Sequence, residues 1–188
     1  MKIFFFLVLL FFFISCTPDY SPKPSGYFHI DLEDHNYKSL IDYPEFEFNI
    51  SNQVEVIKIP EANKGKWFNL AYPRLNAQIY CSYLPITKMN LEQAFKKGHE
   101  FIGKHTVKIE EIQEQAFESQ EQNVYGFIYK LKGEAASPIQ FMLTDSISSF
   151  FRGALYFNDI PNQDSIAPVL EYINKDIQII IESFRWKK

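Results

Sequence analysis

VYGFIYKLKGEAASPIQFMLTDSISSFFRGALYF, residues 124–157, decides the fold, because it holds three aromatic-rich runs separated by two polar segments. The runs are residues 124–131, 139–143 and 150–157, and aromatic and β-branched side chains of this kind favour strands. The intervening segments contain Gly133, Pro138 and the polar residues 144–146, which are typical of short connections. Three strands joined by short connections predict an antiparallel meander.

The chain before this stretch continues the strand pattern. Residues 27–32, 45–50 and 54–59 alternate between apolar and polar side chains, as half-buried strands do. Residues 67–72 and 75–83 predict a pair of strands joined around Pro73 and Arg74. Residues 106–112 alternate again, whereas residues 110–119 fit either a strand or a helix.

Two helices are expected. Asn90 opens the first, with Gln93 three residues later as in a capping box. The second shows the clearest periodicity, with Ser165 as its N-cap and basic residues from Arg185 onward at its negative end. Its apolar positions recur at steps of three and four, namely 166, 169, 170, 173, 177, 180, 181 and 184. The fold class is therefore α+β, a mainly antiparallel sheet covered by helices, with an order similar to the Mog1/PsbP-like sandwich.

The first sixteen residues have the layout of an export signal. Met1 and Lys2 precede twelve apolar residues, fewer than the roughly 20 that a membrane-spanning helix needs. The block ends at Phe13-Ile14-Ser15-Cys16, which resembles a lipobox except that leucine is usual at position 13. We expect Cys16 to carry acyl chains such as palmitate, which hold a protein firmly when two or more are present. The alternative is an ordinary signal peptide that happens to contain a cysteine.

These features divide the chain into three parts: a lipoprotein signal peptide (1–15), the lipidated cysteine with a proline-rich tether (16–26), and a single globular α+β domain (27–188). The net charge of −4 becomes slightly more negative when the signal and its lysine are removed. A mildly acidic domain without a basic block excludes nucleic acid as an expected partner. The acylated cysteine is the expected contact with the lipid bilayer.

A search for chemistry gives no expected catalytic residue, metal site or cofactor, so we predict a protein that is not an enzyme. His99 and His105 are six residues apart and point to different sides of a helix, which excludes chelation of one zinc from it. The acidic residues around His29 and His35 lack the spacing of a calcium loop. Cys81 lies in an apolar alternating strand, where a free cysteine is usually a small buried hydrophobe.

One polar group stands out among the aromatic residues of the meander. Asp145, Arg152 and Asn158 form the candidate interaction site, since an arginine among aromatic rings can stack on a ring or contact a partner protein. An ion pair with a neighbouring acid such as Asp145 is the commoner outcome.

Several strings of sequence resemble a known family. They include residues 26–32 (GYFHIDL), 67–73 (WFNLAYP), 124–126, 135–141, 143–146, 151–157, 161–162, 164–165 and 184–187. Together they are similar to GldD, the gliding-motility lipoprotein family of Bacteroidetes. The resemblance implies a cell-envelope lipoprotein required for gliding, a movement that depends on adhesins exported by the type IX secretion system. It carries over no catalytic residue and only the lipid site, at Cys16.

The sequence thus predicts a non-enzymatic accessory protein whose partners are other gliding and secretion proteins of the envelope. Thr17 follows Cys16, where some bacteria place an aspartate for inner-membrane retention, so the outer membrane is favoured and the inner membrane stays an alternative. Asp19 is the one acid soon after Cys16, which favours the periplasmic side over the cell surface. The alternative function is a periplasmic ligand-binding or hydrolytic lipoprotein with an aromatic pocket.

Overall fold

The computed structural model describes residues 30–60, 66–104, 109–158 and 163–187 of the 188-residue chain. The signal peptide, Cys16 and the tether predicted to end at residue 26 lie outside these ranges. No helix within them is both long enough and apolar enough to cross a membrane.

Strands dominate the described part of the chain, which also contains two α-helices and one short 3-10 helix. The elements, in chain order, are β1 (Tyr37–Leu40), β2 (Phe46–Ser51), β3 (Glu55–Ile59), β4 (Lys66–Tyr72), η2 (Pro73–Leu75), β5 (Ala77–Pro85), α2 (Lys88–Lys104), β6 (Ile109–Ser119), β7 (Val124–Gly133), β8 (Ile139–Thr144), β9 (Ser149–Phe157), α3 (Gln163–Ser183) and β10 (Arg185–Trp186).

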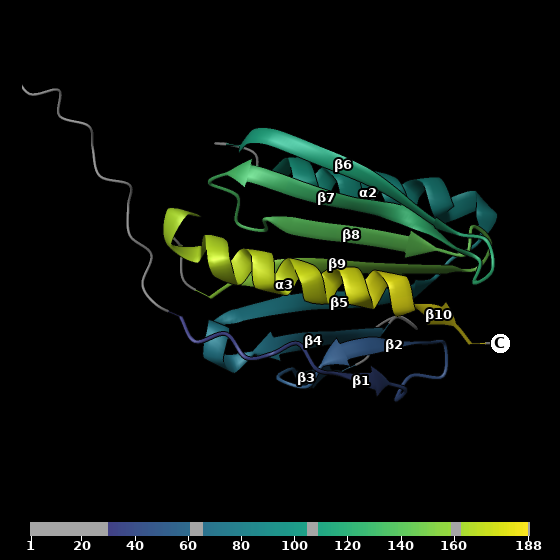
Figure 1. Cartoon of the computed structure of the whole chain (residues 1–188). Helices are drawn as coiled ribbons and strands as arrows, with labels where there is room; N and C mark the ends of the chain where they lie inside the picture. The colour runs from purple at the N-terminus through teal and green to yellow at the C-terminus, as the bar shows by residue number, and fades with distance from the viewer. Residues whose placement is uncertain (1–29, 61–65, 105–108, 159–162, 188) are drawn as a thin grey trace, which may run out of the picture.

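The strands from β3 to β9 form one sheet in the order β3-β4-β5-β9-β8-β7-β6, and every neighbouring pair is antiparallel. Two meanders, β3-β4-β5 and β7-β8-β9, meet where β5 pairs with β9, with Tyr80 opposite Ala154. The chain leaves the middle of the sheet at Pro85, continues as α2, and returns at the far edge as β6 (Figure 1). The predicted α+β class with a mainly antiparallel sheet is confirmed; the likeness to a Mog1/PsbP-like sandwich stays a prediction.

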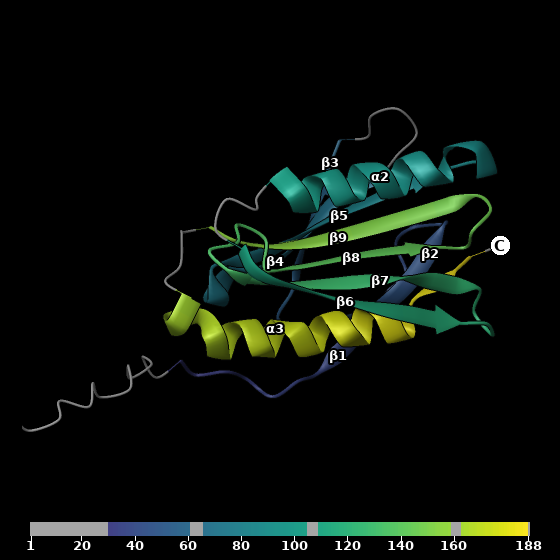
Figure 2. The same cartoon turned by 90° about the horizontal axis from the view of Figure 1, so that it is seen from above.

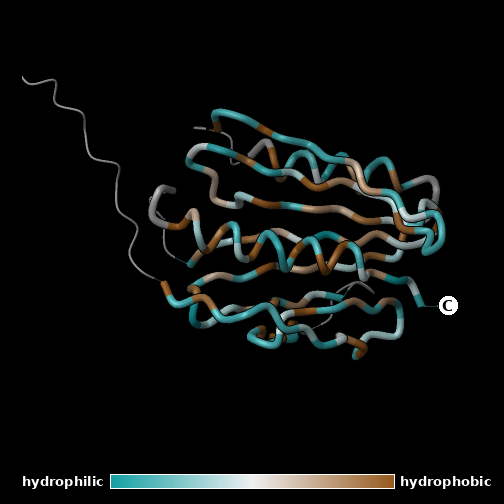
Figure 3. Tube along the Cα trace, viewed as in Figure 1, coloured by the Kyte–Doolittle hydropathy of each residue, from teal (hydrophilic) through white to brown (hydrophobic). Residues whose placement is uncertain are grey.

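The two helices lie on opposite faces of this sheet (Figure 2). A small sheet of order β1-β2-β10 accompanies α3 and packs with it over one face. Apolar positions recur along α3 between polar ones (Figure 3). Of these, Val169, Ile173, Ile177 and Ile180 are buried. The larger core fills this side, while a smaller core around Tyr129, Met142 and Phe150 fills the side of α2.

Several element boundaries differ from the predictions. Residues 30–32 belong to an irregular segment instead of a strand. The first helix begins at Lys88, two residues before Asn90, whose side chain reaches back and accepts a hydrogen bond from the Thr87 backbone N–H at 2.6 Å. The last helix begins at Gln163, so Ser165 is not its N-cap. Residues 110–119, which fitted either state, are strand.

The end of α3 also differs. The helix stops at Ser183, whose hydroxyl bonds to the Ile179 carbonyl and accepts a hydrogen bond from the Asn49 backbone N–H of β2. Arg185 and Trp186 then pair with β2 as β10 instead of extending the helix. Arg185 still bonds to a terminal helix carbonyl, that of Ser183, at 3.1 Å.

Candidate functional site

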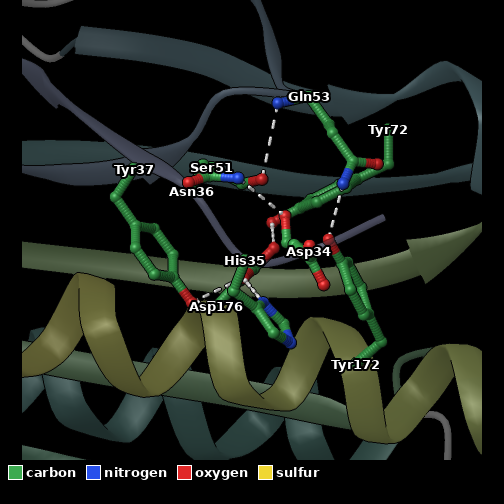
Figure 4. Close-up of polar contacts among 9 residues, drawn as sticks. All are labelled: Asp34, His35, Asn36, Tyr37, Ser51, Gln53, Tyr72, Tyr172 and Asp176. Atoms are coloured by element: carbon green, nitrogen blue, oxygen red, sulfur yellow. Dashed lines mark hydrogen bonds and ion pairs between the residues drawn. The ribbon is translucent and has the colours of Figure 1, made fainter. Parts of the chain in front are cut away.

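A buried carboxylate lies on α3 where this helix faces β1 and β4. Asp176 is 1% exposed, and its Oδ1 accepts hydrogen bonds from His35 Nδ1 at 2.8 Å and from the Tyr37 hydroxyl at 3.0 Å (Figure 4). Its Oδ2 accepts a bond from the Tyr72 hydroxyl at 3.0 Å. Burying a charge is costly unless hydrogen bonds compensate it, and three donors do so here. We call Asp176, His35, Tyr37, Tyr72 and Tyr172 the Asp176 cluster.

Tyr172 closes the cluster one helical turn before Asp176. Its ring stacks on the His35 imidazole with centroids 4.2 Å apart, and its hydroxyl accepts a 2.6 Å bond from Gln53 Nε2. Burial, and then the charge of Asp176, raise the pKa of Tyr172 above its ordinary value, and the same causes hold the pKa of Tyr72 well above it. The tyrosines therefore stay protonated, and those bonded to Asp176 act as donors.

The cluster fastens the irregular segment 30–36 to the body of the protein. His35 and Tyr37 bring α3 and β1 together, and Glu33 forms an ion pair with Arg74 of η2. The Asn52 backbone N–H donates to the Asn36 carbonyl at 2.8 Å. Since this segment leads into the domain from the N-terminal part of the chain, the arrangement joins that approach to the core.

The sequence does not predict this cluster. His35 stands out only for its acidic neighbours, which lack the spacing of a calcium loop, and Asp176 belongs to no motif. One local signal existed: position 176 falls on the helix face defined by Ile173, Ile177 and Ile180, where an acid is unexpected unless it has partners. The partners themselves, 104 to 141 residues away, leave no local signal.

The three predicted interaction residues do not form one site. Arg152 lies within β9 on the sheet face that α2 covers, where its Nη2 donates to Gln140 Oε1 at 2.6 Å and its guanidinium lies 4.8 Å from the Phe101 ring centre. The predicted ion pair of Arg152 with Asp145 is therefore wrong. The structure instead shows the predicted contact of the arginine with an aromatic ring. Burial lowers the pKa of Arg152, and Tyr156 opposes this shift.

Asn158 directly follows β9 and belongs to a row of side-chain amides. Its Nδ2 donates to Asn76 Oδ1 at 2.7 Å, and its Oδ1 accepts from Gln78 Nε2 at 2.9 Å. Asn69 continues the row through a 3.1 Å bond to Gln78. Asn76 has a left-handed φ of 51°, so the contact with Asn158 closes the turn between η2 and β5.

Asp145 organises the turn between β8 and β9. Its Oδ1 accepts the backbone N–H groups of Ile147, Ser148 and Ser149 at 2.8 to 2.9 Å, and its Oδ2 accepts the Ser148 hydroxyl at 2.7 Å. Burial alone would raise the pKa of Asp145, but these hydrogen bonds outweigh it and lower the pKa below its usual 3.8. Its role is structural, at the end of β9 opposite to Asn158.

Asp145→Ala is expected to reduce the free energy of unfolding at pH 7 by about 1–2 kcal/mol, as loss of a capping side chain does. Because the pKa is lower in the folded state, the stabilisation by the ionised form is present above pH ~4 and is lost as the pH falls through the folded value. Urea denaturation across this range measures both effects. Ile147→Ala, at a side chain 60% exposed in the same turn, should change little; a pH-independent difference between wild type and Asp145→Ala would contradict the assignment.

The remaining candidates are accounted for by packing. Cys81 is 3% exposed and burial raises its pKa, as expected for a buried hydrophobe. His99 of α2 bonds through Nε2 to the Tyr129 hydroxyl at 2.8 Å, while His29 and His105 lie outside the described residues. Among those described, no three histidines, cysteines or acids gather as a metal site would require.

Two surface clefts lie among the described residues. The first, of about 240 Å³, lies where β1 and β2 meet the end of α3 and is lined largely by polar residues such as Glu47, Asn49 and Arg185. The second, of about 310 Å³, lies between α2 and strands β6 to β8, and Phe95, Phe117 and Phe127 make it largely apolar. Its volume falls at the lower end of the range for small-molecule sites.

Comparison with known proteins gives one clear result. A family model described as gliding motility lipoprotein GldD matches residues 17–186. A comparison with curated proteins gives no match. The matched range begins directly after Cys16, ends at Trp186 and includes both the Asp176 cluster and the amide row. The chain therefore belongs to the gliding motility lipoprotein GldD family.

Proposed function

We propose that this protein is required for gliding motility as a lipid-anchored, non-enzymatic accessory component of the gliding and type IX secretion machinery. The observation that carries the proposal is the family match over residues 17–186. In this proposal Cys16 bears the lipid, residues 17–26 are the tether, and the domain acts by contacting other envelope proteins. The outer membrane, with the domain in the periplasm, is the proposed location.

The Asp176 cluster supports this reading. A tethered protein that works through contacts needs a firm link between its lipidated end and the surface that meets the partner. His35, near the end of the irregular segment, and Tyr37, the first residue of β1, supply such a link to α3. The hydrogen bonds of the cluster join side chains of the protein to one another and so hold its elements together.

The alternative, a ligand-binding or hydrolytic lipoprotein, would use the aromatic cleft beside α2. In favour of it are the apolar lining and the volume of about 310 Å³. The residues with polar side-chain groups that line that cleft are Glu118, Tyr125, Thr144 and Ser146, and an enzyme would have to assemble its catalytic groups from them.

A deletion strain tests the proposed function. Loss of the gene is expected to abolish colony spreading and to reduce export of surface adhesins, and the wild-type gene should restore both. A strain that spreads and exports normally without the gene would contradict the proposal.

Cys16→Ala tests the lipid attachment. Without the thiol no acyl chain can be added, so the variant should move from the membrane fraction to the soluble fraction and should fail to restore spreading. Cys81→Ala is the matched control, because that buried thiol has no proposed role in attachment. Fractionation with immunoblotting measures the shift; a Cys16→Ala protein that stays with the membrane would overturn the tether.

A further inference from the structure

Strand β6 forms one edge of the seven-stranded sheet. It runs for eleven residues, Ile109–Ser119, about 37 Å at the usual rise per residue, and pairs with β7 alone among the described strands. Its side chains from residue 110 to 116 are all exposed. An edge strand presents a row of backbone N–H and C=O groups to which another strand can bond. The second edge, β3, is less than half as long with five residues, Glu55–Ile59.

Acidic residues define the chemistry of this edge. Glu110, Glu111, Glu114 and Glu118 lie on β6, and one lysine, Lys132 of β7, pairs with Glu111 at 2.7 Å. A second copy of the chain paired along β6 would bring glutamates next to glutamates, which is unfavourable across strands. The same charges favour a strand that carries lysine or arginine.

Three side chains of β6 lie on the face of the sheet that α2 covers. Glu114, Ala116 and Glu118 lie opposite Tyr129, Phe127 and Tyr125 of β7, so they share one face. Glu114 is held by a hydrogen bond with the Tyr129 hydroxyl, which His99 also contacts.

Ala116 and Glu118 line the apolar cleft beside α2. Phe95, on the helix, and Phe127, on β7, supply aromatic walls. The small Ala116 side chain leaves that cleft accessible from the sheet edge, so an apolar side chain on a strand added there can reach the aromatic rings. Binding by strand addition takes its affinity from backbone bonds and its specificity from such side-chain sites.

We propose that β6 accepts an extended segment of a partner protein as an eighth strand, with the pattern basic–x–apolar–x–basic. Its two basic side chains pair with Glu114 and Glu118, and the apolar side chain between them enters the cleft at Ala116. Residues two apart on a strand share a face, which sets this spacing. The inference rests on the proposed function, since it names the chemistry of the partner that the domain contacts.

The probe is a synthetic peptide, Thr-Thr-Lys-Thr-Leu-Thr-Lys-Thr-Thr, titrated into the lipidated protein purified in detergent. We expect binding that slows amide hydrogen exchange in residues 109–119. Glu114→Lys combined with Glu118→Lys should weaken binding about tenfold, because two favourable cross-strand charge pairs become repulsive. The same double variant should instead prefer a peptide with glutamate in place of both lysines.

A matched control changes the same charge elsewhere. Glu171→Lys with Glu182→Lys alters two exposed acids of α3 and should leave peptide affinity unchanged. Thermal denaturation is the control for folding: both double variants should melt at the same temperature as the wild type. Absence of binding, equal affinity for both double variants, protection outside β6, or a dimer formed through β6 would each overturn the proposal. None of these outcomes depends on the gliding phenotype of the deletion strain, so the two proposals fail separately.

Discussion

Phe46→Ala is expected to lower the free energy of unfolding by about 3–5 kcal/mol, enough to threaten folding of a domain of this size. Phe46 of β2 is fully buried, and its ring lies 5.0 Å from Tyr43, 5.2 Å from Phe151 and 5.9 Å from Phe184. These rings come from the loop before β2, from the large sheet and from the end of α3. Alanine would leave a cavity where the small sheet, the helix and the large sheet meet.

Guanidinium denaturation of the wild type and the variant measures this effect. Phe46→Leu, which retains most of the volume, should lose much less stability. Ile41→Ala removes an apolar side chain that is 63% exposed in the loop before β2 and is expected to change stability by less than about 0.5 kcal/mol. If Phe46→Ala and Ile41→Ala were equally mild, the aromatic cluster would not be the centre of the core.

Much of the secondary structure could be predicted because it follows from the local periodicity of apolar residues. The alternation of residues 45–50 places Phe46, Phe48 and Ile50 on the buried side of β2, and the aromatic runs of residues 124–157 do become the β7-β8-β9 meander. Residues 27–32 show why alternation can fail. Their described part, from Ile30, lies outside the sheets; Ile30 packs against the larger core, and the following Glu33 forms an ion pair with Arg74.

The features that could not be predicted depend on residues that are far apart in the sequence. Strands β5 and β9 are separated in sequence by α2 and three strands, and no local pattern predicts that they pair. The same holds for β10, which exists because β2 offers an edge to Arg185 and Trp186. Of the predicted site residues, Arg152 contacts Phe101 instead of Asp145, since the Asp145 carboxylate is bonded within its own turn.

Asp176→Ala is expected to lower the free energy of unfolding by about 3 kcal/mol, the loss that follows when a buried charged partner is removed and its donors stay behind. His35, Tyr37 and Tyr72 would each lose their acceptor at this site, in an environment that is largely closed to water. Besides this loss of global stability, we expect a local loss of protection from hydrogen exchange. Hydrogen exchange in residues 30–40 should quicken more than exchange in β8 or β9, because His35 and Tyr37 hold that segment to α3.

Two variants separate this role from general damage to the helix. Lys175→Ala changes the exposed neighbour of Asp176 and should alter neither stability nor exchange by a measurable amount. Tyr72→Phe removes one donor while keeping the ring, so it should cost about 1 kcal/mol and leave exchange in residues 30–40 near the wild-type rate. A double-mutant cycle of Asp176→Ala with His35→Ala should show that the two changes are not additive, since both break the same 2.8 Å bond. Additive effects, or exchange in residues 30–40 that is unchanged in Asp176→Ala, would mean that the cluster does not couple this segment to α3.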